Sequence, residues 1–194
     1  MFDQIRFGRE FFELLVEVDG RIVGQVARGG CRLCGGRLCR SDYARKPRGG
    51  VMAAAGEEFL TRFSLCCSRE GCRKRTTPPS VRFLGRRVYI GVVVIVASIV
   101  ARVGRTEASI RQATGVPPKT TRRWLDWWRG PFLLTEVFVA LRARLIGVAM
   151  EELPASVVRP LGDTPEAQVR SLLEWLKPLT TGSGAGSRGS RDIA

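Results

Sequence analysis

The sequence Cys31-Arg-Leu-Cys34-Gly-Gly is followed further along the chain by Cys66-Cys67-Ser-Arg-Glu-Gly-Cys72. Two thiolates at such a spacing can hold one metal ion, and the neighbouring glycines allow the tight turn of a zinc knuckle. Four thiolates from two knuckles leave no open position for a catalytic water. We therefore expect one closed, tetrahedral, structural Zn²⁺ site formed by Cys31, Cys34, Cys67 and Cys72.

Two of the six cysteines lie outside that set. Cys66 competes with Cys67, because adjacent residues at a strand end face opposite ways and only one can ligate comfortably. Cys39 is expected to be a small buried hydrophobic residue. The chain has no histidine, so a metal site must use cysteine or carboxylate ligands, and histidine-based catalysis is excluded. Six thiols without metal are the alternative, which the paired, glycine-flanked clusters disfavour.

The residues around these clusters, 27–80, contain much glycine and arginine and few long apolar runs. Such a segment cannot build a sufficient core and needs a cross-link to fold. The stretches 37–48 and 59–65 are expected to pair as a hairpin, with 73–77 as a third strand. Knuckles at the ends of paired strands predict a small zinc ribbon. Its apolar face is expected from Leu38, Tyr43, Phe59, Phe63 and Leu65.

A second motif lies at 106–129, inside a stretch from 85 to 150 that is expected to be helical. Gly115 can adopt the positive φ of a tight turn, and Pro118 suits the first turn of a following helix. A short helix, a glycine turn and an amphipathic second helix together form a helix-turn-helix. Its apolar contacts are expected from Ile110, Ala113, Val116, Trp124 and Leu125.

Polar side chains at the start of that second helix would face away from the core, where the motif approaches base edges in a major groove. They are Lys119, Thr120, Arg122 and Arg123. The basic run Arg73, Lys74 and Arg75 in the ribbon is expected to contact phosphates, which adds affinity without sequence information. The alternative for the helix pair is an ordinary helical hairpin with a solvated basic face.

Residues 1–26 place apolar side chains at helical spacing, and Asp19-Gly20 is expected to close this amphipathic lead-in. The stretch Val88–Ala101 is almost purely apolar, but its length of about 14 residues falls short of the roughly 20 that a membrane-spanning helix needs. We expect a buried core helix there and no membrane contact. The apolar residues of the lead-in are Phe2, Ile5, Phe11, Phe12, Leu14, Leu15 and Val18.

The C-terminal region 154–179 contains proline and glycine up to residue 165, so we expect it to begin with a linker. Glu166–Lys177 then predicts a short amphipathic helix. Residues 180–194 are rich in glycine and serine and have nothing to bury, which predicts a disordered tail. The expected fold is α+β and mostly α: an N-terminal helix, a small β zinc ribbon, a helical domain with the helix-turn-helix, and the tail.

The composition favours a polyanionic partner. The 194 residues include 32 Lys and Arg against 18 Asp and Glu, for a formal net charge of +14 and a pI near 10.8. Such a charge attracts DNA, RNA or an acidic membrane surface. The N-terminal residues lack the pattern of a signal peptide. We therefore expect a cytoplasmic protein, whose clustered cysteines are metal ligands before they are disulfides.

The order of these parts resembles the zinc-ribbon and helix-turn-helix region of bacterial insertion-sequence transposases. It is most similar to small accessory DNA-binding proteins that transposable elements encode beside a separate integrase-type transposase. One departure is Cys39, which stands where similar chains have His and leaves a different ligand set open. The resemblance rests on Cys31-Arg-Leu-Cys34-Gly-Gly, Asp42-Tyr43-Ala-Arg-Lys-Pro-Arg-Gly49, Gly71-Cys72-Arg-Lys-Arg-Thr-Thr-Pro-Pro-Ser80-Val-Arg-Phe-Leu-Gly-Arg-Arg87 and Arg122-Arg-Trp-Leu-Asp-Trp-Trp-Arg129.

A transposase needs carboxylates that converge on two metal ions to cut and join phosphodiesters. Few acidic residues follow the helix-turn-helix, and no run of alternating strands follows that would present such a set. We therefore expect sequence-specific DNA recognition without cleavage, and no enzymatic activity. The resemblance implies double-stranded DNA and a separately encoded transposase or integrase as partners, at the bacterial nucleoid. A transcriptional regulator and a zinc-ribbon module for protein or RNA are the alternatives.

Overall fold

The computed structural model describes residues 7–45, 56–83, 91–102, 106–143 and 149–180. Within these ranges the chain is mostly helical and has a small antiparallel sheet, in agreement with the expected α+β class. The helices are α1 (Arg9–Arg28), α2 (Gly91–Arg102), α3 (Glu107–Thr114), α4 (Pro118–Arg129), α5 (Glu136–Arg142), α6 (Ala155–Val158) and α7 (Pro165–Leu176). The strands are β1 (Leu38–Arg40), β2 (Tyr43–Ala44), β3 (Thr61–Arg62), β4 (Leu65–Cys67) and β5 (Arg75–Thr76).

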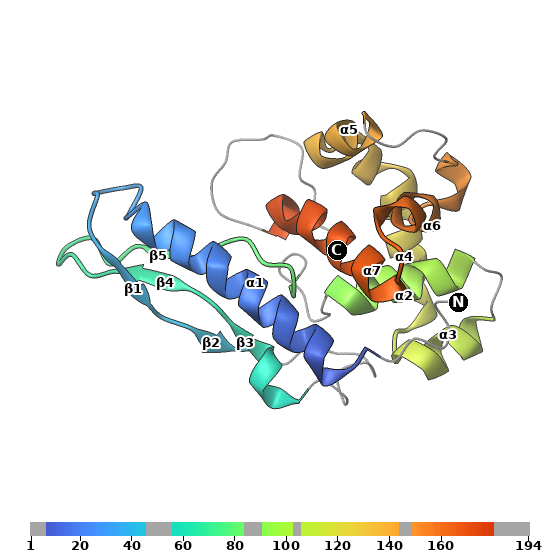
Figure 1. Ribbon diagram of the computed structural model, residues 1–194, viewed down its shortest axis with the longest axis horizontal. Coiled ribbons are helices and arrows are strands. Elements are labelled where there is room, and N and C mark those ends of the chain that lie inside the picture. The colour runs from blue at the N-terminus through green and yellow to red at the C-terminus, as the bar shows by residue number, and fades with distance from the viewer. Residues whose placement is uncertain (1–6, 46–55, 84–90, 103–105, 144–148, 181–194) are drawn as a thin grey trace.

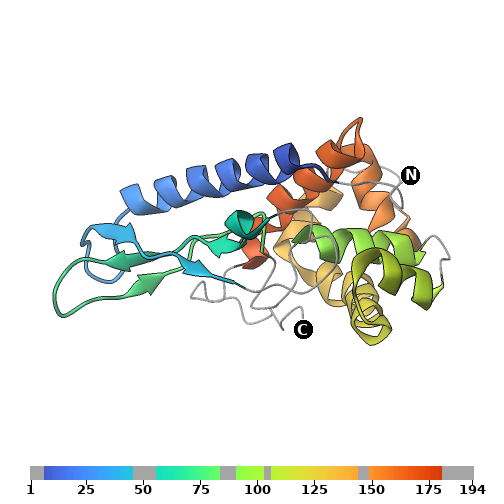
Figure 2. The same cartoon turned by 90° about the horizontal axis from the view of Figure 1, so that it is seen from below.

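The molecule is elongated, with the strands at one end and α2 to α7 gathered at the other (Figure 1). Helix α1 runs alongside the strands and reaches the helical end, and the view from below shows it on one side of the ribbon only (Figure 2). Short 3₁₀ helices lie between or after these elements, at Glu57–Leu60, Pro131–Leu134, Met150–Glu152, Arg159–Leu161 and Lys177–Thr180.

The strands form the expected three-stranded arrangement in the order β1-β4-β5, and β2 pairs with β3. Leu38 lies opposite Cys67, and Tyr43 lies opposite Arg62, so the two ladders keep one register and act as one long hairpin. The apolar face differs from the expected one. Strand alternation puts Tyr43 on the side away from α1, where it is exposed, although Arg62 directly opposite it is buried.

Phe59 also lies outside the apolar face of the ribbon. It sits in the 3₁₀ turn Glu57–Leu60, where its ring packs against Phe12 of α1, with the ring centroids 5.9 Å apart.

The buried apolar residues form two clusters, a large one that we call the main core and a small one in the ribbon. Helix α1 contributes to both. Its first half, with Phe11, Phe12 and Leu15, packs in the main core with the helical end. Its last turns place Val23 and Val26 against the ribbon residues Leu38, Leu65 and Cys67. A single helix therefore links the ribbon to the helical end.

The expected helix end at Asp19-Gly20 is wrong, since α1 continues to Arg28. Asp19 is fully buried, and its carboxylate accepts hydrogen bonds from Ser80 Oγ at 2.7 Å, Val81 N at 2.7 Å and Arg82 Nε at 2.8 Å. A charge that is paired and hydrogen-bonded in this way can sit on the inner face of a helix. Phe2 and Ile5 lie outside the described residues.

Arg82 completes this buried junction. Its guanidinium donates to the carbonyl oxygens of Phe59 and Thr61 at 2.7 and 2.9 Å, in addition to Asp19. These contacts tie α1, the second strand of the hairpin and the segment that leaves the ribbon to one another.

The apolar stretch 88–101 was expected to form a buried core helix, and its described part does so, while residues 88–90 lie outside the described part. Helix α2 begins at Gly91, and its residues from Val92 to Ala97 are all buried in the main core. Among the described helices, none has the length and apolarity that crossing a membrane requires.

The C-terminal region differs from the expectation in two places. Residues 154–165, expected to be a linker, contain α6 and bury Ala155, Val157 and Val158 in the main core. The tail does not begin at Thr180, which is buried and accepts a hydrogen bond from Ser80 N at 2.9 Å. Residues 181–194 lie outside the described part. The short helix at 166–177 is confirmed as α7, which Thr164 caps.

Candidate functional site

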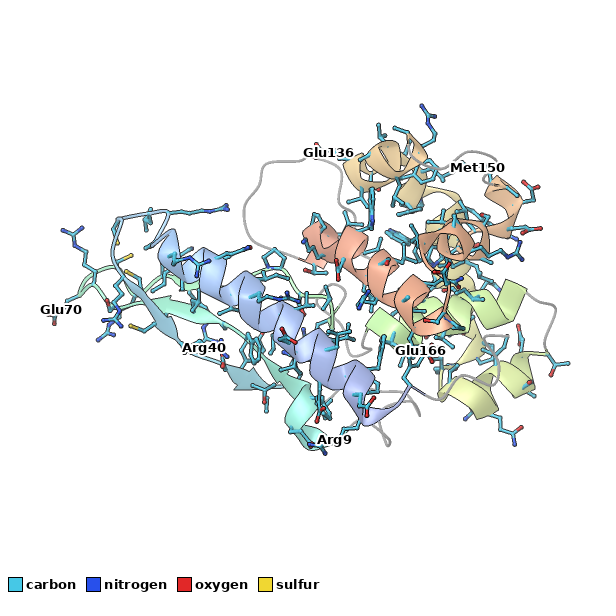
Figure 3. The ribbon with its side chains drawn as sticks, viewed as in Figure 1. Arg9, Arg40, Glu70, Glu136, Met150 and Glu166 are labelled. Carbon is cyan, nitrogen blue, oxygen red and sulfur yellow. The ribbon has the colours of Figure 1, made fainter. Side chains whose placement is uncertain are left out.

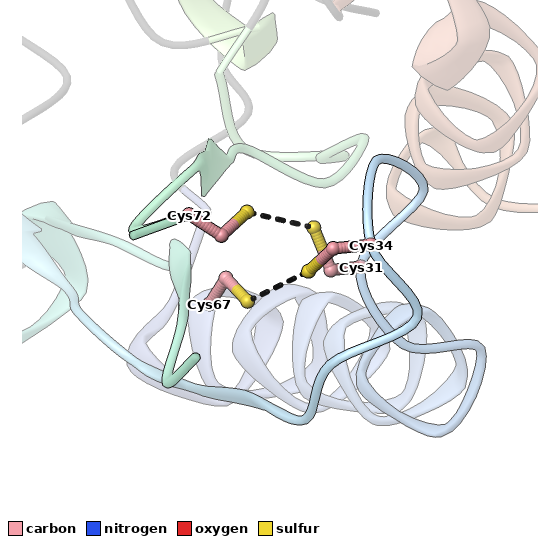
Figure 4. A group of neighbouring side chains, drawn as sticks. All are labelled: Cys31, Cys34, Cys67 and Cys72. Atoms are coloured by element: carbon pink, nitrogen blue, oxygen red, sulfur yellow. Dashed lines mark hydrogen bonds between the residues drawn. The ribbon is translucent and has the colours of Figure 1, made fainter. Parts of the chain in front are cut away.

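Four cysteines converge where the ribbon knuckles meet, at the end of the ribbon farthest from α2 to α7 (Figure 4). Their sulfur atoms all lie within 4.8 Å of one another. Cys31 Sγ lies 3.8 Å from Cys72 Sγ, and Cys34 Sγ lies 3.5 Å from Cys67 Sγ. A tetrahedral ion with metal–sulfur bonds of about 2.3 Å requires sulfur–sulfur separations of about 3.8 Å. The four thiols therefore lie close enough together to bind one metal ion.

Backbone hydrogen bonds hold each knuckle in shape. In the first, Cys31 N donates to Gly36 O at 2.9 Å and Gly35 N donates to Cys31 O at 2.7 Å, with Gly35 at φ +71°. In the second, Cys72 N donates to Arg69 O at 3.1 Å, and Gly71 has φ +80°. Gly35 and Gly71 occupy a left-handed conformation that other residues seldom adopt, which explains their place beside the ligands.

Gly36 leaves room for two ligands from different knuckles. A Cβ atom at this position would lie 3.0 Å from Cys67 Sγ and 3.3 Å from Cys34 Sγ. It would also lie 3.1 Å from the Cβ atom of Arg69, in the second knuckle. The second glycine of the Cys-Gly-Gly sequence is therefore a packing requirement of the site.

The choice between Cys66 and Cys67 follows from strand alternation. Cys67 is fully buried on the α1 side with the other ligands, whereas Cys66 faces the other way and its Sγ lies 3.4 Å from Arg73 O. The expectation that Cys39 is buried is wrong. It lies directly opposite Cys66 on β1, and its side chain is exposed on the same outer side of the ribbon.

The thiols differ in acidity. The backbone amide of Gly36, followed by the Cys72 thiol, lowers the pKa of Cys34 to about 7. For Cys67 the amide of Arg69 favours the thiolate, but burial and the neighbouring thiols outweigh it and raise the pKa to about 12. A divalent cation among these sulfurs would favour all four thiolates, since metal ligation requires deprotonated cysteine.

The second motif consists of two short helices joined by a glycine turn. Helix α3 begins after Thr106, whose side chain caps the amide of Ser109, and it ends at Gly115 with φ +67°. Val116 is fully buried after the turn, and Pro118 is the first residue of α4. Among the expected apolar contacts, Ile110 and Trp124 are buried, while Leu125 is half-buried. The side chain of Ala113 lies outside the described part.

Three of the four residues expected to read bases are exposed on α4: Lys119, Arg122 and Arg123. Thr120 is half-buried. Arg122 is not free, because its guanidinium donates to Glu107 Oε1 on α3 at 2.8 Å. Within the described part of the chain, no acidic side chain pairs with Lys119 or Arg123.

The Arg122–Glu107 pair was not predicted, because nothing in the sequence links residues on different helices. The opposite face of α4 is fixed by an aromatic cluster. Trp128 packs edge-to-face on Phe132 with a centroid distance of 4.6 Å, and Phe132 in turn contacts Phe138 of α5. The tryptophans therefore reach α5 through Phe132, and this packing sets which face of α4 is outward.

The ribbon cations Arg73, Lys74 and Arg75 are exposed in and beside β5. They lie at the strand end of the molecule, whereas α3 and α4 lie at the helical end (Figure 1). The two groups of basic residues are thus not brought together, and a single partner would have to extend along the molecule to meet both.

Comparisons with family models, curated proteins and solved structures give no match to this chain.

Proposed function

We propose that this chain is a sequence-specific DNA-binding protein that carries one structural zinc ion and serves a transposable element without cleaving DNA. The observation that carries the proposal is the pair α3–α4, with a left-handed Gly115 turn and basic side chains outward at the start of the second helix. That position is the one that enters a major groove in helix-turn-helix proteins.

Charge supports the same partner. Lys119 and Arg123 are exposed and unpaired within the described residues, and the net charge of the chain is +14. An arginine can bind guanine through two hydrogen bonds, and such a contact contributes about 1–3 kcal/mol of discrimination against other bases. Arg122 would exchange Glu107 for a base or phosphate, at little cost, because exposed ion pairs contribute about 0–1 kcal/mol.

Zinc is the proposed metal because four thiolates in a closed tetrahedral arrangement are typical of structural zinc sites. The protein purified without added metal is expected to contain one zinc per chain by elemental analysis. The link to a transposable element rests on the resemblance of the sequence, and a separately encoded transposase or integrase is its proposed partner.

Selection from a random duplex library tests the function. The selected site is then titrated with the wild type, with Arg123→Ala and with Arg129→Ala, an exposed arginine at the other end of α4. Arg123→Ala is expected to reduce the ratio of specific to scrambled-site binding by about tenfold or more. Arg129→Ala should leave that ratio unchanged. A library that yields no enriched site would refute sequence-specific recognition.

Absence of cleavage is tested with supercoiled plasmid and Mg²⁺ or Mn²⁺. We expect no nicking by the chain alone. Nicking that persists through purification and disappears when a carboxylate of this chain is changed would overturn the proposal that it only recognises DNA.

A further inference from the structure

The ribbon has one covered and one open face. Side chains alternate between the faces of a strand, and Leu38, Leu65 and Cys67 point toward Val23 and Val26 of α1. The residues between them must point the other way. No described helix lies on that side (Figure 2).

We call this side the open face and define it by register. Ser68 N donates to Arg37 O, and Ser41 N donates to Ser64 O, so the ladder extends beyond β1 and β4 at both ends. Cys39, Cys66 and Arg75 lie side by side across the three strands. The open face consists of Arg37, Cys39, Ser41, Tyr43, Cys66, Ser68 and Arg75. Ser64 and Arg62 share this register but are buried, because the end of β5 and the segment after it cover them. Ser64 Oγ donates to Thr76 O, and Arg62 donates to Pro78 O.

Small side chains occupy the middle of the open face, and cations flank it. Cysteine and serine rise little above the backbone, while Arg37 and Arg75 are exposed on its outer strands. Neighbouring strands lie about 4.8 Å apart, so the strands of these two arginines lie about 10 Å apart. The surface between them consists of short side chains. The phosphate backbone of a nucleic acid can approach such a surface closely.

Arg75 is held in place on this face. Its guanidinium donates to Ser41 Oγ at 3.2 Å and lies over the ring of Tyr43, 5.7 Å from the centroid. Neither contact neutralises its charge. A cation that is already oriented loses little side-chain entropy when it binds an anion.

The charge of the ribbon favours an anionic partner. Residues 29–45 contain four basic residues and 61–77 contain five, so nine cations stand against two acids, Asp42 and Glu70. Asp42 is engaged by Arg40 and by the amide of Ser64. Glu70 lies at the far knuckle (Figure 3). Even with the two negative charges of a zinc tetrathiolate, the ribbon keeps a positive charge.

We propose that the open face of the ribbon docks on the phosphate backbone of duplex DNA, with Arg37 and Arg75 as its phosphate contacts. The inference rests on the proposed function, and adds to it which surface of the ribbon meets the duplex. The knuckles and the α1 side then face away from the DNA.

Cys39 reports this contact in the native, metal-loaded chain, because it lies on the open face and outside the metal site. Its rate of alkylation by N-ethylmaleimide is measured by mass spectrometry, with and without a saturating duplex. We expect the duplex to slow alkylation at least tenfold. An added thiol at Arg21→Cys, an exposed position on α1, is the control and should react at the same rate in both states.

Arg75 of β5 and the preceding residue, Lys74, provide a pair of variants. Arg75 is on the open face, whereas Lys74 lies opposite Cys67 and has the other orientation. Arg75→Ala is expected to weaken binding to every duplex about fivefold, and to lower the slope of log affinity against log salt by about one. Lys74→Ala should change both quantities much less, because the proposal, unlike the expectation from the sequence, takes Lys74 out of the phosphate contact and leaves it on the α1 side.

The outcomes separate the two proposals. Suppose that Arg123→Ala loses discrimination between the specific and the scrambled site, but the duplex does not slow alkylation of Cys39 and Arg75→Ala binds DNA like the wild type. The docking face is then wrong, and the proposed function stands. Protection of Cys39 by RNA of equal length but not by the duplex overturns the assignment of the partner. If no duplex binds, both proposals fail.

Discussion

Neighbouring thiols at the end of β4 have different surroundings. Cys67 is buried with three other sulfurs, whereas Cys66 lies across the strands from the exposed Cys39. Cys67→Ser is expected to remove the metal, because a hydroxyl is a poor substitute for a thiolate ligand. Cys66→Ser is expected to keep one equivalent, measured by elemental analysis. Equal metal loss in the two variants would contradict the assigned ligands.

Gly36 tests the packing of the same site. Gly36→Ala puts a methyl group 3.0 Å from Cys67 Sγ, so the ligands must move apart, and we expect weaker metal binding in competition with a chelator. Gly20→Ala is the control: it lies in α1 with nothing within 4 Å of the added carbon. It should leave the metal in place and add up to about 1 kcal/mol of stability. Unchanged affinity in Gly36→Ala would show that the knuckle has spare room.

The acidity of Cys34 predicts how metal binding depends on pH. Its pKa of about 7 means that the metal-free site holds this thiol as a thiolate above pH 7 and protonated below it. Metal binding then displaces one more proton below pH 7 than above it. Apparent affinity, measured by chelator competition from about pH 5.5 to 8.5, should fall on acidification and fall more steeply below about pH 7. A constant slope would contradict the assigned acidity.

Helix α1 depends on one buried ion pair. Asp19 and Arg82 are almost inaccessible to solvent, and Arg82 has no other described acidic partner. Asp19→Ala leaves a buried guanidinium unpaired, so we expect a loss of about 3–5 kcal/mol in urea unfolding. Glu13→Ala, which removes an exposed pair with Arg9 on the same helix, should cost less than about 1 kcal/mol. Similar losses in both would show that the junction is solvated.

At the scale of the whole molecule, the two apolar clusters differ in size. The ribbon cluster has five buried residues, two of which are metal ligands, Cys31 and Cys67. The main core contains α2 and α7 and most of α1. Removal of the metal is therefore expected to unfold the ribbon and leave the helical end folded, because a core so small cannot offset the entropy of ordering its strands.

Hydrogen exchange after treatment with a chelator measures this difference. Amides of β1, β4 and β5 are expected to lose protection, together with the last turn of α1 beyond Val23. Amides of α2 and α7 should keep theirs. Loss of protection throughout the chain would show that the ribbon and the helical end unfold as one cooperative unit.

Local chemistry made several features predictable from the sequence. Ligand spacing and glycine identified the four cysteines, because knuckle geometry depends on a few adjacent residues. The same holds for Gly115 and Pro118, whose backbone preferences determine where α3 ends and α4 begins. The apolar run of α2 and the amphipathic pattern of α7 likewise predict from the local sequence that these helices are buried.

Only the tertiary structure decided the features that depend on distant partners. Asp19-Gly20 has the local character of a helix end, but Ser80, Val81 and Arg82 satisfy the Asp19 carboxylate and the helix continues. The stretch after residue 154 is buried because its valines pack in the main core. Strand register, which is a long-range property, turned Cys39 and Tyr43 outward. Composition and spacing act over a few residues, whereas burial and ion pairing are settled by what the rest of the chain places opposite them.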